Sequence, residues 1–306
     1  MAAPARILRL ARLLQGLSFY LPFSVIVCAL TLLQRACALK PILALFALLL
    51  SLPAAAAPLT IELDHSQKTW QTAELLKHPD AQTVQIVDDV SYKRTMTYRA
   101  VPLAVLLPGL KSANHLQAVA LDGFAAELAA APLLEKNGAR AWLAVEDPAH
   151  PWPPLAQGKP SAGPFYLVWT HPEAGHISPE QWPFQVSRFK QLQTVGERFP
   201  ALLPDPKLAP NDPVNQGFAL FQKNCLACHR LNGGGDAQMG PDLNAPYNPT
   251  EYFSGDFLKR YIRDPQSLRH WPQAKMPAFT ASVLPDNELD LLVGYLRHMA
   301  GRKQQP

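Results

Sequence analysis

The sequence predicts a multidomain chain in which an α+β region precedes an all-α region. Residues 58–200 contain short apolar runs of the kind that form strands, and residues 201–213 are rich in proline. Residues 214–306 are mostly of helical character. A chain of 306 residues is long enough for two domains, if a domain takes roughly 150 residues. We therefore expect two folded bodies joined by a proline-rich linker, after a leader at residues 1–57.

The leader is set apart by its charge and its apolar runs. Two apolar runs lie at 17–33 and 41–52, and small residues follow the second run. Basic residues before a short apolar run and a small-residue site are typical of a secretory signal peptide, which we expect to be cleaved after Ala56. The alternatives are a true start near Leu39, or an uncleaved inner-membrane anchor at 17–33. Either way we expect an exported, periplasmic protein.

The charge of the chain comes from this leader. The whole chain has 28 Lys and Arg against 24 Asp and Glu, and the leader holds five of the basic residues and no acidic one. The remainder is close to neutral, with no basic stripe interleaved with aromatic residues of the kind that a nucleic-acid groove needs. We therefore exclude nucleic acid as a partner, and we expect membrane contact only through an uncleaved anchor.

Five segments predict secondary structure in residues 58–200. Apolar alternation predicts strands at 59–63 and 82–87, and apolar runs beside glycine predict further strands at 118–121 and 165–169. Residues 98–107 are expected to be a loop followed by a short helix. These elements indicate a small α+β domain.

The stretch Cys-Leu-Ala-Cys-His holds Cys225, Cys228 and His229. This spacing is the attachment signal for c-type haem. Residues i and i+3 of a helix lie on one face, so both thiols can bond to one edge of a porphyrin, while the histidine turns beneath the ring to bind iron. If the leader, with Cys28 and Cys37, is removed, this pair is all the cysteine left. We expect one covalently bound haem c.

Two other uses of such a cysteine pair are structural zinc binding and thiol–disulfide exchange. Structural zinc needs four ligands, and the motif supplies three in a cramped cluster without a second cysteine pair. A thiol–disulfide centre would need a thioredoxin-like context, which the sequence lacks.

The second iron ligand is expected from Lys275-Met276-Pro277, a methionine in a proline-bent loop before the last helix. Histidine–methionine ligation raises the reduction potential, which suits an electron carrier. The remaining candidates are Met239, Met299 and His270.

Residues 214–300 resemble a class I cytochrome c. The resemblance depends on the motif above, on the stretch from Gly240 to Leu243, on KMPAF, and on a last helix containing Leu292 and Tyr295. It implies that the carbonyl of Pro241 orients the outer nitrogen of the haem histidine. It also implies that the first and last helices cross. The residues that would meet there are Gly217, Phe218 and Phe221 on the first helix, facing Leu292 and Tyr295.

Residues 120–128, 139–154 and 163–169 resemble the molybdopterin-binding fold of sulfite-oxidase-type enzymes, and above all its minimal relatives. The resemblance covers about residues 80–190. It implies a cleft for a ligand, but the catalytic members bind molybdenum through a cysteine thiolate. No cysteine lies between residues 58 and 224, and an apolar neighbour cannot replace a soft thiolate. The sequence therefore argues against a molybdopterin cofactor.

A basic cluster precedes the methionine loop. We expect it either to be a solvated face or to steer an acidic redox partner, which would raise the association rate more than the affinity. Its residues are Lys259, Arg260, Arg263, Arg269 and Lys275.

Together these features predict an exported electron-transfer protein whose first domain docks a redox partner or ligand. One alternative is a molybdopterin-dependent oxidoreductase that passes electrons to its own haem. Another is a haem-based sensor or assembly factor.

Overall fold

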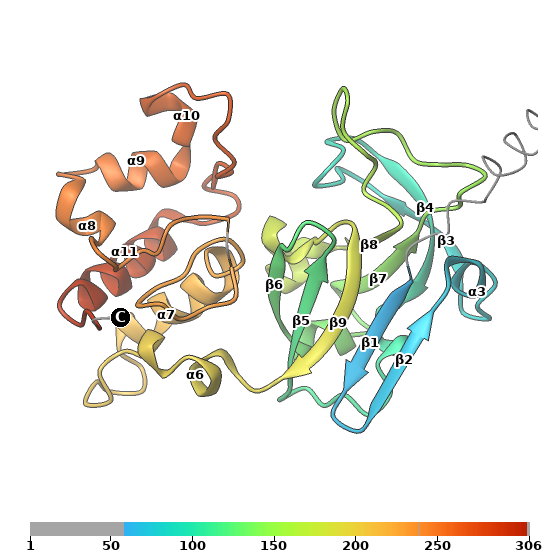
Figure 1. Ribbon diagram of the computed structural model, residues 1–306, viewed down its shortest axis with the longest axis horizontal. Coiled ribbons are helices and arrows are strands. Elements are labelled where there is room, and N and C mark those ends of the chain that lie inside the picture. Colours follow the sequence, from blue (N-terminus) through green and yellow to red (C-terminus); the bar gives the residue numbers. More distant parts are fainter. Residues whose placement is uncertain (1–57, 238, 305–306) are drawn as a thin grey trace, which may run out of the picture. The chain divides into compact units, whose positions relative to one another are not determined.

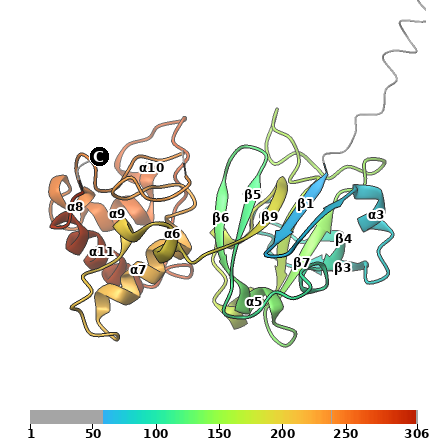
Figure 2. The ribbon, with the colours of Figure 1, turned by 60° about the horizontal axis from the view of Figure 1, so that its bottom comes forward.

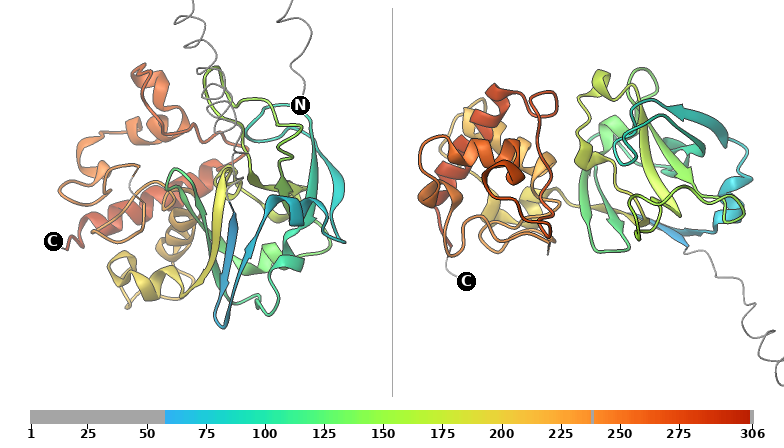
Figure 3. Two further views of the ribbon diagram at one scale, coloured as in Figure 1. Left: turned by 45° about the vertical axis from the view of Figure 1, so that its right-hand side comes forward. Right: turned by 90° about the horizontal axis from the view of Figure 1, so that it is seen from above.

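The computed structural model describes residues 58–237 and 239–304. The predictions for the leader, including the cleavage site, the anchor at 17–33 and its two cysteines, lie outside the described residues. Among the described residues, no helix is both long and apolar enough to cross a membrane. Strands occupy the blue-to-yellow part of the chain and longer helices the orange-to-red part (Figures 1 and 3).

The first part of the chain, residues 58–194, contains two sheets. The five-stranded sheet has the order β2-β1-β9-β5-β6, and Figure 2 shows β1, β9, β5 and β6 side by side. The four-stranded sheet has the order β3-β4-β7-β8. The strands are β1 (Leu59–Leu63), β2 (Ser66–Trp70), β3 (Gln82–Ile86), β4 (Met96–Pro102), β5 (His115–Ala120), β6 (Ala125–Ala129), β7 (Arg140–Val145), β8 (Phe165–Thr170) and β9 (Val186–Leu192). All pairs are antiparallel except β1 with β9.

This part has more strand and less helix than an α+β domain would have. Its α-helices are α3 (Thr72–Leu76), α4 (Leu103–Leu106) and α5 (Ala130–Leu134), none longer than five residues. The predicted loop at 98–102 is wrong, because these residues belong to β4, which pairs with both β3 and β7. The short helix expected after it is α4. The prediction missed the strand because its pairing with β7, which is remote in the sequence, is not visible in the local pattern.

The core of the first part is built mainly from side chains on the sheets. Trp169, Tyr98, Tyr166, Phe165 and Phe189 are among its largest fully buried side chains. The Trp169 indole N–H donates to the carbonyl of Gln181 at 2.8 Å. A buried indole needs such a partner, so tryptophan serves as core here.

The second part of the chain is all α, as predicted. Its helices are α7 (Pro213–Asn224), α8 (Pro249–Tyr252), α9 (Phe257–Arg263), α10 (Pro265–Leu268) and α11 (Asp286–Ala300). The expected contact between the first and last helices is present. A Cβ on Gly217 would lie 2.2 Å from the Leu291 carbonyl oxygen, and the Phe218 and Phe221 rings lie 5.5 and 5.4 Å from that of Tyr295. Glycine is needed because the backbones of α7 and α11 approach so closely at this point.

The proline-rich segment at 201–213 packs against the helical core. Leu202 is fully buried in that core, as is Val195 on α6 (Val195–Arg198), and the carbonyl of Leu202 accepts the Tyr295 hydroxyl at 2.7 Å. The Asp205 carboxylate pairs with Arg302 at 3.1 Å. Side chains from 195 onward therefore belong to the helical core, whereas the strand core ends at Phe189. Proline marks a segment of turns here, after a 3-10 helix at Pro200–Leu202, and apolar side chains such as Leu202 attach it to the core.

Candidate haem site

The cysteine motif follows directly after α7. Asp212 begins the helix by accepting a hydrogen bond from the N–H of Val214 at 2.8 Å. The helix ends at Asn224, so Cys225 is its C-cap rather than an internal residue. A tight turn continues from there, with the N–H groups of Cys228 and His229 donating to the Cys225 carbonyl at 3.1 and 2.9 Å. Cys225 and Cys228 are therefore positioned by a tight turn that follows α7. The prediction from their spacing placed them within a helix, and this detail is wrong.

The imidazole of His229 is oriented by a backbone carbonyl. Its Nδ1 lies 2.9 Å from the oxygen of Pro241. The Nδ1–H group donates this bond, which leaves the lone pair of Nε2 for a metal. Burial lowers the pKa of His229, although the Pro241 carbonyl acts in the opposite direction. The ring is therefore neutral near pH 7, as a metal ligand must be.

Gly240 allows the Pro241 loop to lie against the imidazole. A Cβ at this position would lie 2.5 Å from Cε1 and 2.6 Å from Nδ1 of His229. The N–H of Gly240 also donates to the Cys228 carbonyl at 2.7 Å, and that of Leu243 donates to the Arg230 carbonyl at 2.8 Å. The loop is thus tied to the motif on both sides of Pro241.

The predicted residues line one cavity of about 590 Å³, within the range of roughly 300 to 1,000 Å³ typical of cofactor sites. Cys225, Cys228, His229, Pro241 and Met276 all lie in its wall. The rest of the wall is largely apolar and includes Leu243, Phe253, Leu258, Ile262, Phe279 and Leu292. Thiols, a neutral imidazole and a thioether around an apolar space are the groups that a covalent haem needs, so the residues fit it.

The two thiols are free and half-buried. Burial raises the pKa of Cys228 to about 12 and that of Cys225 further. Cysteines of disulfide-exchange centres have a lowered pKa, so these thiols do not suit that chemistry. Within the described residues, no three His, Cys, Asp or Glu side chains converge into a metal site.

The rival iron ligands differ in position. Met299 is fully buried in the helical core, and neither it nor His270 is in the cavity wall. Met239 does line the cavity and is 40% exposed. It precedes Gly240, which lies against His229. Met276 also lines the cavity, and it belongs to a different loop, so both methionines remain candidates by position.

Ion pairs reduce the net charge of the basic cluster. Lys259 pairs with Asp290 at 2.5 Å, and Arg263 pairs with Asp286 at 2.6 Å. Lys275 is exposed and lines the cavity. Lys275 therefore places a positive charge at the rim of the cavity.

Sequence reasoning missed the roles of Gly240, Asn244 and Asn248. Gly240 was considered only as part of a motif, although a glycine before the proline could have suggested a close approach to the histidine. The two asparagines are fully buried, and nothing in their local sequence indicates this.

One of the comparisons with known proteins bears on the part of the chain that holds this site. The family model described as Cytochrome c matches residues 214–300. The curated proteins gave no match. Among solved structures, the chain is similar to the sulfane dehydrogenase SoxCD from Paracoccus pantotrophus, at 18% identity and a TM-score of 0.35. That likeness covers 49% of this chain and 41% of that chain, so less than half of SoxCD is matched.

Residues 214–300 are a cytochrome c domain, and such a domain supports haem-based electron transfer. A TM-score of 0.35 carries no argument about the strand-rich part. Its resemblance to the molybdopterin-binding fold therefore stays a prediction.

Proposed function

We propose that this chain is an exported electron-transfer protein with one covalent haem c. Cys225 and Cys228 would attach the haem, and His229 and Met276 would hold its iron. The observation that carries the proposal is the shared cavity, where both thiols, the oriented imidazole and the thioether lie in one largely apolar wall. Haem bound there supplies a one-electron iron couple.

The chain controls that couple through two features. The Pro241 carbonyl holds His229 in the tautomer that presents Nε2 to the iron, and it makes the imidazole a better electron donor. The apolar wall excludes water, which favours the less charged, reduced state, as does a methionine ligand. The rim includes Tyr252 and Trp271, which are 59% and 55% exposed, so aromatic surface is available where a partner would approach.

The strand-rich domain is proposed to dock a redox partner or a ligand without turnover. The sequence of residues 58–224 supplies no thiolate for a molybdenum centre of the sulfite-oxidase type. The partner of the haem domain is proposed to be acidic, guided by the rim charge of Lys275 and its neighbours. Rates of electron transfer to such a partner should therefore fall as ionic strength rises.

Iron and molybdenum should be measured together by elemental mass spectrometry on protein purified from its native host. One iron and no molybdenum per chain is the expected result. One molybdenum per chain would refute the role proposed for the first domain and would favour an oxidoreductase. A chain without iron would refute the haem assignment itself.

Met276→Ala tests the axial ligand, with Met239→Ala as the matched control because both side chains line the cavity. The oxidised protein should lose its weak near-infrared sulfur-to-iron band only in Met276→Ala, and its midpoint potential should fall by about a hundred millivolts or more. A band lost in the control instead would identify Met239 as the ligand. No such band in the unsubstituted protein would favour the haem-sensor alternative.

A further inference from the structure

The loop that carries the Pro241 carbonyl is held in place by the neighbouring carboxylate. Asp242 Oδ1 accepts hydrogen bonds from the N–H groups of Asn232, Asn244 and Ala245 at 3.1, 2.8 and 2.9 Å. Its Oδ2 accepts the N–H of Gly233 at 2.7 Å. Bonds from N–H groups to a carboxylate are roughly twice as strong as neutral ones, so this anchor holds the loop firmly.

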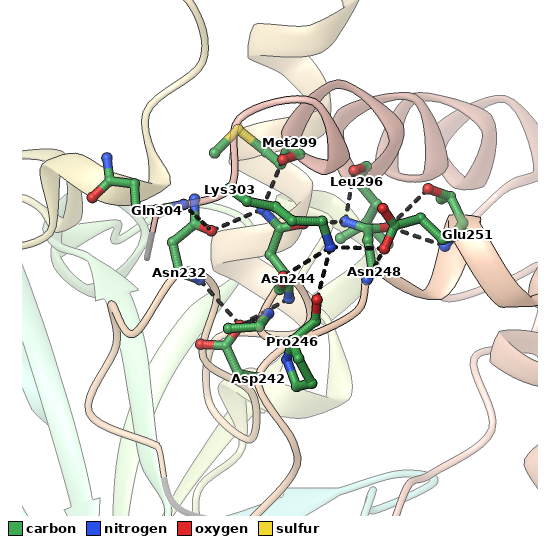
Figure 4. Close-up of polar contacts among 12 residues, drawn as sticks. Asn232, Asp242, Asn244, Pro246, Asn248, Glu251, Leu296, Met299, Lys303 and Gln304 are labelled. Atoms are coloured by element: carbon green, nitrogen blue, oxygen red, sulfur yellow. Dashed lines mark hydrogen bonds and ion pairs between the residues drawn. The ribbon is translucent and has the colours of Figure 1, made fainter. Parts of the chain in front are cut away.

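Two buried asparagines connect this loop to the last helix (Figure 4). Asn244 and Asn248 are both 0% exposed. Asn244 Nδ2 donates to the Met299 carbonyl at 2.7 Å, and Asn248 Nδ2 donates to the Leu296 carbonyl at 2.9 Å. Asn248 Nδ2 also donates to Asn244 Oδ1 at 2.9 Å.

Asn232 closes the network from the other side. It adopts a positive φ of 52°, and its Oδ1 accepts from Asn244 Nδ2 at 2.8 Å. Its own Nδ2 donates to the carbonyls of Ala201 and Arg302 at 3.1 Å each. Buried amides whose partners are all present form a rigid unit, since moving one member leaves other polar groups unpaired.

The network acts on the iron ligand through one peptide group. The carbonyl that accepts from His229 Nδ1 belongs to the peptide that joins Pro241 to Asp242. Fixing Asp242 therefore fixes the plane of that peptide. A strong bond at Nδ1 makes the imidazole more electron-rich, which stabilises the oxidised iron and lowers the potential.

We infer that Asp242, with Asn244 and Asn248, forms a positioning network that holds the Pro241 carbonyl on His229 and thereby tunes the reduction potential of the haem. The inference rests on the proposed function. It adds that the potential depends on residues that touch neither the iron nor its ligands. It also links the potential to α11, because the network ends on carbonyls of that helix.

Asp242→Asn and Asp242→Ala separate positioning from charge, because both remove the same negative charge. An asparagine keeps an oxygen where Oδ1 accepts three N–H groups, whereas an alanine keeps none. Potential should be measured by redox titration of the full-length holoprotein. Exchange of the His229 Nδ1 proton should be measured by NMR on the reduced, ¹⁵N-labelled holoprotein. Asp264→Asn is the matched control, since this aspartate also accepts a backbone N–H but lies in a different loop.

The expected result is a potential that rises in the order Asp264→Asn, Asp242→Asn, Asp242→Ala. Nδ1 proton exchange in Asp242→Ala should be at least about tenfold faster, which corresponds to roughly 1.4 kcal/mol. Equal potentials in the two Asp242 variants, with unchanged proton exchange, would overturn the inference. If Asp242→Ala does not take up haem, Asn244→Ala replaces it, because it deletes no charge and should show the same two effects. Absence of covalent haem in the unsubstituted protein is a separate outcome, which refutes the proposed function.

Discussion

Replacing Gly217 by alanine should destabilise the helical domain, although alanine is the better helix former. In an exposed helix, the change from glycine to alanine gains about 1 kcal/mol. Here the added Cβ would lie 2.2 Å from the Leu291 carbonyl oxygen and 2.7 Å from the Tyr295 Cβ. The first contact is with backbone, so no rotation of a side chain relieves it.

The magnitude follows from the distance. Carbon–oxygen contacts are normally about 3.3 Å or longer, so α7 and α11 must separate by roughly 1 Å. That shift also loosens the packing of Phe221 and Tyr295, which are both fully buried. Overpacking a core lowers the free energy of unfolding by about 1–3 kcal/mol, and such a short contact with backbone belongs at the upper end of that range. The better helix propensity of alanine offsets about 1 kcal/mol of this loss. We therefore expect the free energy of unfolding to fall by about 2 kcal/mol. For a domain of this size the thermal midpoint should fall by about 8–16 °C.

Gly294→Ala is the matched control. Gly294 lies on α11, and a Cβ there would meet nothing within 4 Å. It should stabilise the domain by up to about 1 kcal/mol. Thermal unfolding should be followed in the full-length holoprotein by circular dichroism in the haem absorption band, which reports on the helical domain alone. A Gly217→Ala midpoint equal to or above the unsubstituted value would refute the proposed close crossing of the two helices.

Two further changes have outcomes set by single contacts. Gly240→Ala would place a Cβ 2.5 Å from Cε1 of His229. The haem-to-protein absorbance ratio should therefore fall, and the reduction potential of the remaining holoprotein should rise. Unchanged values of both would contradict the close approach of this loop to the imidazole. The N–H of Asp205 donates to His298 Nε2 at 3.1 Å, which requires a neutral ring, and burial with the charge of Arg302 lowers the His298 pKa. The unfolded chain then binds a proton near pH 6.5 that the folded chain does not, so this stabilisation is complete above about pH 6.5 and is lost as the pH falls below it. His298→Gln, whose side-chain oxygen can accept the same bond, should flatten the drop in thermal midpoint between about pH 7.5 and 5; an identical drop in both proteins would exclude His298 as its cause.

The chemistry of the candidate site was predictable because it depends on local spacing. Cys225, Cys228 and His229 are close in the chain, and a single turn brings them together whatever the rest of the fold does. The crossing of the first and last helices was expected from the resemblance to class I cytochromes c, and the contacts of Gly217 with α11 confirm it. The family model described as Cytochrome c matches residues 214–300, which contain this site.

The strands of the first part were only partly predictable. Those at 59–63, 82–87, 118–121 and 165–169 were found from their apolar patterns, whereas β2, β6, β7, β9 and the strand content of 98–102 were not. A strand is stabilised in part by partners that are distant in the sequence, as β4 is by β7. Local pattern cannot supply that information.

The sequence by itself determined the haem motif, its histidine and the all-α character of the second part, because each depends on residues within a few turns of one another. Only the tertiary structure decided that Met239 and Met276 share the cavity with that histidine whereas Met299 is buried in the helical core, that the proline-rich segment packs on that core, and that Asn244 and Asn248 are buried beneath α11. These outcomes depend on burial. A residue is buried by segments that are remote in sequence and meet it only when the chain has folded.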